Sequence, residues 1–273
     1  MGFIISWFGA RAVELIADIY SHLQASILTI FSNQFLLGIL SVVEILAWVL
    51  FGIAVVMRVS ILAEQSARGQ ADILAFGKDV FLGLIFIPLN AMVMIGIFTQ
   101  VTHLQTSVVR QISGGIQVDI TTLFTTSDPV IQFAVLIIFT IATISLAWGS
   151  LARSATVFMY TVCNYCAIIG ITMGNPTFFV TVAGKFAGVC FIHFFQGVFY
   201  FAAIVSLQQN LSGGLATLND ISVLMTPLIY IVFSISSPKV IEMLFANAVG
   251  GRGGLAGGMM QTMMMLRFAT MRR

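Results

Sequence analysis

Five polar side chains lie inside or beside apolar stretches of this 273-residue chain. They are Glu44, Asn90, Lys185, His193 and Gln196. Glu44 lies in the middle of residues 35–57, an apolar run long enough to cross a bilayer as a helix. A carboxylate at the centre of such a helix costs about 2.5 kcal/mol or more unless it meets a partner or water. Glu44 is therefore expected to face other protein or an aqueous path.

A second set of polar residues recurs at helical spacing. His193, Gln196 and Tyr200 follow one another at intervals of three and four, and Lys185 lies two turns before His193. Such a stripe can line a water path, or its members can form hydrogen bonds between helices, each worth about 0.6 to 2 kcal/mol. If Glu44 meets His193 or Lys185, the pair would form a relay for protons or ions.

Pro88 and Asn90 interrupt the second apolar run near its centre. The carbonyl that Pro88 frees at Leu84, together with the Asn90 amide, can bind an ion, although a packed kink is the commoner cause. Cys163, Cys166 and Cys190 lie in apolar stretches, so they are interpreted as packing residues.

Composition defines the class of protein. Apolar residues make up 59% of the chain and charged residues 8%, against roughly 25% charged in a soluble domain. The mean hydropathy is +1.05. Nucleotide-binding, zinc-protease and hydrolase motifs are absent from the sequence. These features predict a polytopic membrane protein that is not an enzyme and has no cofactor or metal site.

The expected fold is all-α, a membrane helix bundle. Residues 1–32 predict an interfacial helix with its polar residues on one face; a first transmembrane helix is the alternative. These polar residues, candidates for interaction, are Arg11, Glu14, Asp18 and His22. Five spans follow, and a sixth apolar segment is expected to be short or re-entrant, because Pro227 breaks it and Pro238 stops it. The five spans are residues 35–57, 80–102, 130–150, 156–173 and 186–206, and the sixth segment is residues 221–237.

Lysine and arginine positions predict the orientation. If five spans cross, nine of the twelve basic residues lie on one side, which the positive-inside rule assigns to the cytoplasm. The nine are Arg58, Arg68, Lys78, Arg153, Lys239, Arg252, Arg267, Arg272 and Arg273. Arg153 belongs to this group as part of the connection between the third and fourth spans. The amino terminus is then outside and the carboxyl terminus inside.

Three domains follow from this layout: the helix of residues 1–32, a transmembrane domain over residues 33–238, and a tail over residues 239–273. Within the second, residues 103–129 form an extracytoplasmic connection whose candidate contacts are Arg110 and Asp119. The tail combines a glycine-rich joint with a basic, methionine-rich stretch suited to adaptable apolar contacts with a partner or with lipid headgroups. Its candidate contacts are Met263, Met264 and Arg267.

This layout resembles the TrbL-like family, the polytopic inner-membrane subunit of type IV secretion and conjugation machines. The resemblance rests on the amphipathic amino-terminal helix, the span with Trp48, the connection ending in residues 76–79, the extracytoplasmic connection and the Gly/Met tail. It is a resemblance of architecture over most of the chain.

The resemblance implies a multi-copy subunit of the bacterial inner membrane that assists pilus assembly and the passage of DNA or protein substrate. Its implied partners are a pilin-like subunit, cytoplasmic ATPases, membrane lipids and further copies of itself. The alternative is a small secondary transporter or ion channel that uses Glu44, Asn90 and His193.

Overall fold

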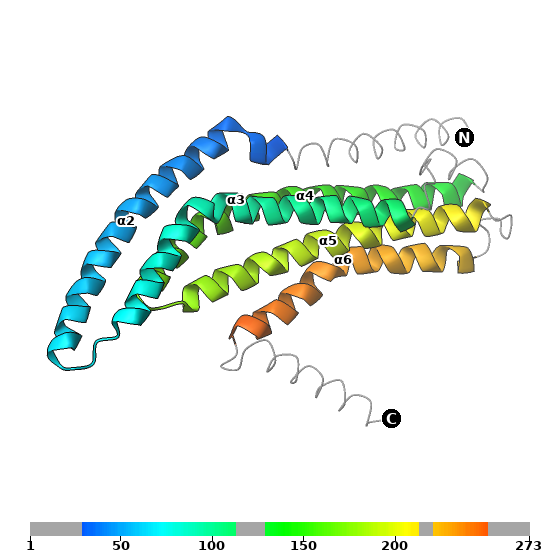
Figure 1. The fold of residues 1–273 in the computed structure, drawn as a ribbon. Helices are drawn as coiled ribbons and strands as arrows, with labels where there is room; N and C mark the ends of the chain where they lie inside the picture. The colour runs from blue at the N-terminus through cyan, green and yellow to red at the C-terminus, as the bar shows by residue number, and fades with distance from the viewer. Residues whose placement is uncertain (1–28, 113–128, 213–220, 251–273) are drawn as a thin grey trace, which may run out of the picture. The chain divides into compact units, whose positions relative to one another are not determined.

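The described part of the chain consists of helices and turns, with no strand. A computed structural model describes residues 29–112, 129–212 and 221–250. Five helices follow one another (Figure 1): α2 (Gln34–Ala67), α3 (Ile73–Ile112), α4 (Pro129–Thr172), α5 (Thr177–Ser212) and α6 (Ile221–Gly250). α2 to α5 contain four segments long and apolar enough to cross a membrane, and α6 contains a shorter apolar segment, Met225–Ile241. The expected all-helical fold is confirmed for the described residues, and four of its helices could span a membrane.

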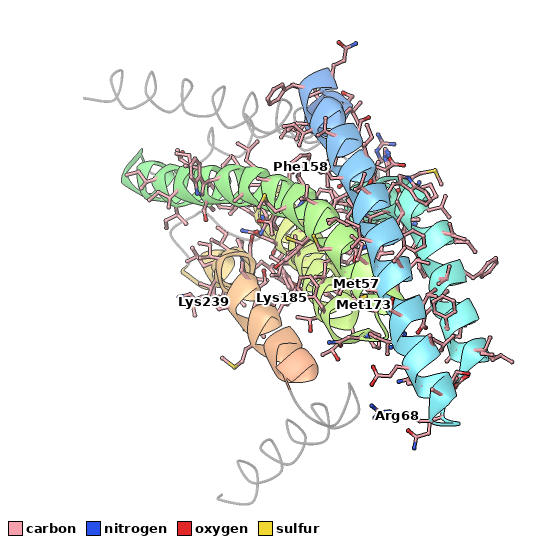
Figure 2. The ribbon with its side chains drawn as sticks, turned by 90° about the vertical axis from the view of Figure 1, so that its left-hand side faces the viewer. Met57, Arg68, Phe158, Met173, Lys185 and Lys239 are labelled. Carbon is pink, nitrogen blue, oxygen red and sulfur yellow. The ribbon has the colours of Figure 1, made fainter. Side chains whose placement is uncertain are left out.

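α2 and α3 are joined by a short turn (Figure 1). The Asn33 side chain caps α2 by accepting a hydrogen bond from the backbone N–H of Phe35. Gly69 adopts a positive φ of 69° in the turn, and Asp72 accepts a hydrogen bond from the Ala75 N–H at the start of α3. Arg68, at the end of α2 (Figure 2), forms an ion pair with Glu64. These local contacts fix where the helices stop and start.

α4 corrects the expected division between the third and fourth spans. Residues 130–150 and 156–173 belong to one continuous helix of 44 residues, apart from Met173 at its end, and Arg153 lies inside this helix rather than in a connection. Residues 151–155 contain neither glycine nor proline, and Leu, Ala and Arg are strong helix formers. The positive charge of Arg153 alone does not interrupt a helix.

α6 corrects the expectation that Pro238 stops the sixth segment. The helix continues through Pro227 and Pro238 to Gly250. Pro238 has no N–H for the carbonyl of Ser234, but the Ser237 hydroxyl donates a hydrogen bond to that carbonyl at 3.1 Å. A serine side chain thus satisfies the group that proline leaves without its usual partner.

α3 also runs further than expected. It passes through Pro88 without a break and ends at Ile112, so residues 103–112 of the predicted extracytoplasmic connection are helical. Arg110 lies in its last turn. Residues 1–28 of the predicted amino-terminal helix, Asp119 and the methionine-rich stretch of the tail lie outside the described residues.

The helices divide between two compact units. Unit 1 comprises Met1–Ile30, Thr99–Ser154 and Cys190–Val240, and unit 2 comprises Phe31–Phe98, Ala155–Val189 and Ile241–Arg273. α3, α4, α5 and α6 each contribute to both units, whereas α2 belongs to unit 2 alone.

Candidate functional site

In unit 2, two asparagines join α3 to α4. Asn90 accepts a hydrogen bond from the Asn164 amide at 2.6 Å and donates one to the Thr161 carbonyl at 2.8 Å. Both asparagines are buried, at 4% and 7% exposed. The Asn90 amide therefore joins α3 to α4 through protein groups. The Oδ1 atom of Asn164 is buried and accepts no hydrogen bond.

Glu44, on α2, lies near the polar group that Asn90 and Asn164 form. Its side chain is half-buried and within electrostatic reach of the Tyr165 hydroxyl, which also lies beside Asn90. Tyr165 is 1% exposed, and its hydroxyl has no hydrogen-bond partner of acceptable geometry. Within the described part of the chain, Glu44 forms no ion pair with Lys185, which is exposed.

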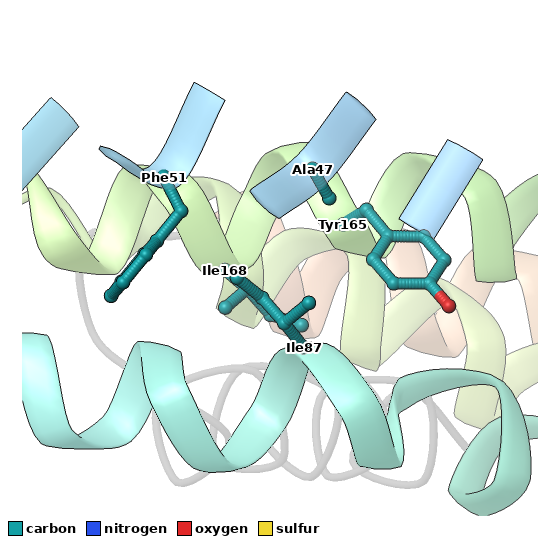
Figure 3. Close-up of a cluster of buried hydrophobic side chains, with 5 residues drawn as sticks. All are labelled: Ala47, Phe51, Ile87, Tyr165 and Ile168. Carbon is teal, nitrogen blue, oxygen red and sulfur yellow. The ribbon is translucent and has the colours of Figure 1, made fainter. Parts of the chain in front are cut away.

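The ring of Tyr165 belongs to an apolar cluster (Figure 3). Its members are Ala47, Phe51, Ile87, Tyr165 and Ile168. The hydroxyl of Tyr165 points away from the other members of the cluster (Figure 3). The ring therefore contributes packing, and its polar end contributes to the group that contains Asn90 and Glu44.

Close approach of α2 and α3 depends on a glycine. A Cβ atom on Gly83 would lie 2.3 Å from Cε2 of Phe51 and 2.8 Å from Oγ1 of Thr172. No other residue type fits there without displacing a buried ring.

The turn between α4 and α5 is held by backbone and side-chain bonds. Gly174 has a positive φ of 82°, and the Asn175 N–H donates to the Gly170 carbonyl at 2.9 Å, which closes the end of α4. The Asn175 side chain then caps α5 at the N–H of Thr177. A guanidinium nitrogen of Arg58 lies 2.7 Å from the position that a Cβ of residue 174 would take, so this arginine packs on the turn.

In unit 1, the predicted polar stripe of α5 meets hydroxyl groups on other helices. His193 Nε2 lies 3.3 Å from the Thr102 hydroxyl of α3. The Tyr200 hydroxyl is hydrogen-bonded to the Thr143 hydroxyl of α4. His193 and Tyr200 are 2% and 1% exposed, respectively, so these bonds are sheltered from solvent. Lys185, predicted as part of the same stripe, belongs to unit 2 and is exposed.

Gln196 takes part in the contact between α5 and α6 through its backbone. Its carbonyl accepts a hydrogen bond from the Ser234 hydroxyl at 2.9 Å, while its side-chain Oε1 is buried without a partner. One residue on, Gly197 leaves space for Gln105 of α3, because a Cβ there would lie 1.2 Å from the Gln105 amide nitrogen. α5 thus contacts both α3 and α6 over a single turn.

The residues that sequence reasoning missed as site residues are Tyr165, Gln105, Ser234 and Arg153. In the sequence, Tyr165 resembles the other aromatic residues of an apolar run. The feature of the sequence that relates to Gln105 is Gly197, a glycine on another helix that leaves space for its side chain. Arg153 is 8% exposed inside α4. Gly149, one helical turn before Arg153, is a feature of the sequence that relates to its burial. A long side chain folds back over the preceding turn of its helix, and a glycine there leaves space for it.

The described residues contain no group of three or more His, Cys, Asp or Glu side chains arranged to hold a metal ion. Comparison with models of protein families, with curated proteins and with solved structures finds no significant match.

Proposed function

We propose that this chain is a non-enzymatic structural and channel subunit of the inner-membrane complex of a bacterial type IV secretion or conjugation machine. In that role it assists pilus assembly and the passage of DNA or protein substrate. The observation that supports this proposal best is the use of the intramembrane polar groups. Asn90, His193 and Tyr200 bond to groups on neighbouring helices, as expected for a packed scaffold.

The exposed surface of α2 supports a role in assembly. Apolar side chains project from several sides of this helix (Figure 2), and Phe35, Val56 and Ile45 are more than 60% exposed. Its buried stripe is narrow, with Leu40, Ala47, Phe51 and Ala54 as the buried residues. Such a surface suits contact with lipid and with further copies or other subunits of a membrane complex.

The proposed orientation has an extracytoplasmic amino terminus and a cytoplasmic carboxyl terminus. Because α4 is one continuous helix, α2 to α6 give at most five crossings. The two termini lie on opposite sides of the membrane only if α6 crosses as well. The turn after α2, with Arg58 and Arg68 close to it, then lies on the same side as the basic tail. The positive-inside rule assigns that side to the cytoplasm.

Purification of the tagged full chain from its native host in mild detergent tests the proposal. Mass spectrometry is expected to find several copies of the chain with a pilin-like subunit and secretion ATPases. Recovery of the chain alone as a small oligomer would contradict the role in a secretion machine.

A second candidate function is a small transporter or ion channel, and the group around Glu44 favours it. A half-buried carboxylate lies within electrostatic reach of a buried hydroxyl, and the buried Oδ1 atom of Asn164 accepts no hydrogen bond. Ion flux into proteoliposomes distinguishes the two functions. A transporter loses flux in Glu44→Gln but not in the matched control Glu64→Gln, which changes an exposed carboxylate on the same helix. A scaffold gives no flux in either variant and still assembles.

A further inference from the structure

Polar groups of three helices gather around Asn90 in unit 2. Asn90, on α3, accepts a hydrogen bond from the Asn164 amide of α4 and lies beside the hydroxyl of Tyr165, also on α4. Glu44 of α2 lies within electrostatic reach of the same hydroxyl. All four residues belong to unit 2. Polar and ionisable groups inside apolar helices are costly and often mark ion sites.

Glu44 lies on the buried side of α2. It follows Leu40 by four residues and precedes Ala47 by three, and both of these residues are buried. Glu44 therefore belongs to the stripe of α2 that packs against the rest of unit 2. Its own side chain is only half-buried. The carboxylate is thus on the side of the buried polar group and still accessible from outside.

The hydrogen bond between the two asparagines determines which atom of Asn164 faces a ligand. Its amide nitrogen is bonded to Asn90, so Oδ1 is the atom that is directed elsewhere. Oδ1 is buried, and so is the Tyr165 hydroxyl, which points away from the apolar cluster (Figure 3). Both are oxygen atoms with lone pairs. With the Glu44 carboxylate they provide one charged and two neutral oxygen ligands.

A line of small and polar residues leads from the start of α2 to Glu44. Gln34, Gly38 and Ser41 follow one another at intervals of four and three, and Glu44 comes three residues later. The first three are exposed, and no atom lies within 4 Å of the position of a Cβ on Gly38. The distance along the helix from Gln34 to Glu44 is about 15 Å. An ion can therefore approach the carboxylate from this end of α2 without passing a bulky apolar side chain on that line.

The chemistry of these groups favours a hard cation of single charge. Carboxylate, amide and hydroxyl oxygens are ligands of hard cations rather than of soft metals. Calcium sites in proteins commonly use several carboxylates, whereas this group contains one. One negative charge is balanced by one positive charge, so an alkali-metal ion matches the group best.

We propose that Glu44, Asn164 and Tyr165 form a binding site for a sodium or potassium ion, and that Asn90 orients Asn164 within it. The ion neutralises the carboxylate inside an apolar helix and joins α2 to α4, as the hydrogen bonds of Asn90 join α3 to α4. The site does not depend on a role in secretion. Binding is also distinct from transport, because a scaffold can hold such an ion in place.

Thermal unfolding of the purified full chain in detergent tests the site. Sodium or potassium chloride is titrated at constant pH against N-methyl-D-glucamine chloride, whose large cation does not fit, so that ionic strength stays constant. One or both alkali-metal ions are expected to raise the unfolding midpoint of the wild-type chain by roughly 3 to 6 °C at ten times the dissociation constant. Equal midpoints in all three salts would overturn the proposal, and would be the result if a basic group of the chain already neutralised Glu44.

Carboxylate variants assign the shift to the site. Glu44→Gln keeps the size of the side chain without its charge and is expected to lose the shift. Glu64→Gln, which changes an exposed carboxylate of the same helix, is the matched control and is expected to keep it. An undiminished shift in Glu44→Gln would place the ion elsewhere and overturn the proposal. A shift with magnesium chloride but with neither alkali-metal salt would overturn the assignment to a cation of single charge.

If Glu44→Gln does not yield folded protein, Tyr165→Phe replaces it. Phenylalanine keeps the ring in the apolar cluster and removes one ligand, so about tenfold more salt is expected to be needed for half of the shift. Tyr230→Phe, which removes a hydroxyl from unit 1, is the control and is expected to leave this concentration unchanged. An unchanged concentration in Tyr165→Phe would overturn the site as proposed. Because the isolated chain is measured, failure here leaves the purification test of the secretion role unaffected.

Discussion

Unit 2 and unit 1 hold their helices together with different chemistry. In unit 2, large apolar side chains such as Phe51 and Ile87 pack in one cluster, and a hydrogen bond between two asparagines joins α3 to α4. In unit 1, hydroxyl and imidazole groups join α3, α4 and α5, and a buried arginine has two nitrogens without partners. The difference indicates that unit 2 is sensitive to changes of volume, whereas unit 1 is sensitive to changes of polar groups.

The largest expected effect concerns volume in unit 2. Gly83→Ala places a methyl group against the buried ring of Phe51 and is expected to lower the free energy of unfolding by about 2 to 3 kcal/mol. Gly96→Ala, on the same helix and with no atom near its Cβ, is the matched control and is expected to be neutral or to stabilise by up to about 1 kcal/mol. Both are measured by SDS titration in mixed micelles. Equal effects of the two substitutions would remove the basis for calling unit 2 sensitive to volume.

The second effect concerns the polar contact between Asn90 and Asn164 in unit 2. Asn90→Leu leaves the Asn164 amide and the Thr161 carbonyl without their partner, which is expected to destabilise by about 2 kcal/mol in the same titration. Gln100→Leu changes an exposed amide of the same helix and is expected to have a small effect. The double variant Asn90→Leu with Asn164→Leu is expected to recover part of the loss. An unchanged stability in Asn90→Leu would show that this pair does not join α3 to α4.

A smaller effect tests whether unit 1 tolerates added volume better than unit 2. Gly197→Ala displaces the end of the Gln105 side chain, which is flexible, so the expected loss is about 1 kcal/mol. Combining it with Gln105→Ala is expected to restore most of that loss, because the methyl group then has space. Failure of the double variant to recover would mean that Gly197 is needed for a reason other than Gln105.

The smallest effect concerns a single bond in unit 1. Tyr200→Phe removes the hydroxyl that bonds to Thr143 and is expected to lower the free energy of unfolding by about 0.6 kcal/mol, the average for hydrogen bonds between membrane helices. The coupling is read from a double-mutant cycle with Thr143→Val. Additive effects in that cycle would place the contribution of Tyr200 in its ring packing alone.

Composition and apolar runs were sufficient to predict helices at each expected span among the described residues. They were insufficient for the helix ends. A run of polar residues such as 103–112 continues α3, because helix propensity does not require an apolar side chain. A positive charge at residue 153 predicts a connection by the positive-inside rule, but the residue lies inside α4. Pro238 predicts the end of α6, but the Ser237 hydroxyl bonds to the carbonyl that proline leaves without its usual partner.

The candidate sites were predictable where a polar residue stands out against an apolar run. Glu44, Asn90, His193 and Gln196 were identified in that way. Their partners could not be predicted in that way. The hydrogen bond between Asn90 and Asn164 joins positions 74 residues apart. The spacing of residues within one helix does not show which residues of another helix they contact. The Tyr165 hydroxyl and the Arg153 guanidinium became visible only when the burial of each was known.

The distance in sequence between Asn90 and Asn164 also has a consequence for biosynthesis. At about 5 to 20 residues per second, the ribosome takes about 4 to 15 s to add the 74 residues that separate them. α2 is made before this interval and α3 is completed within it, while the Asn90 amide still lacks the groups that it bonds in the finished protein. Water in the insertion pathway or a polar group of the insertion machinery has to satisfy that amide until α4 arrives, which makes the arrival of α4 a defined step in the assembly of unit 2.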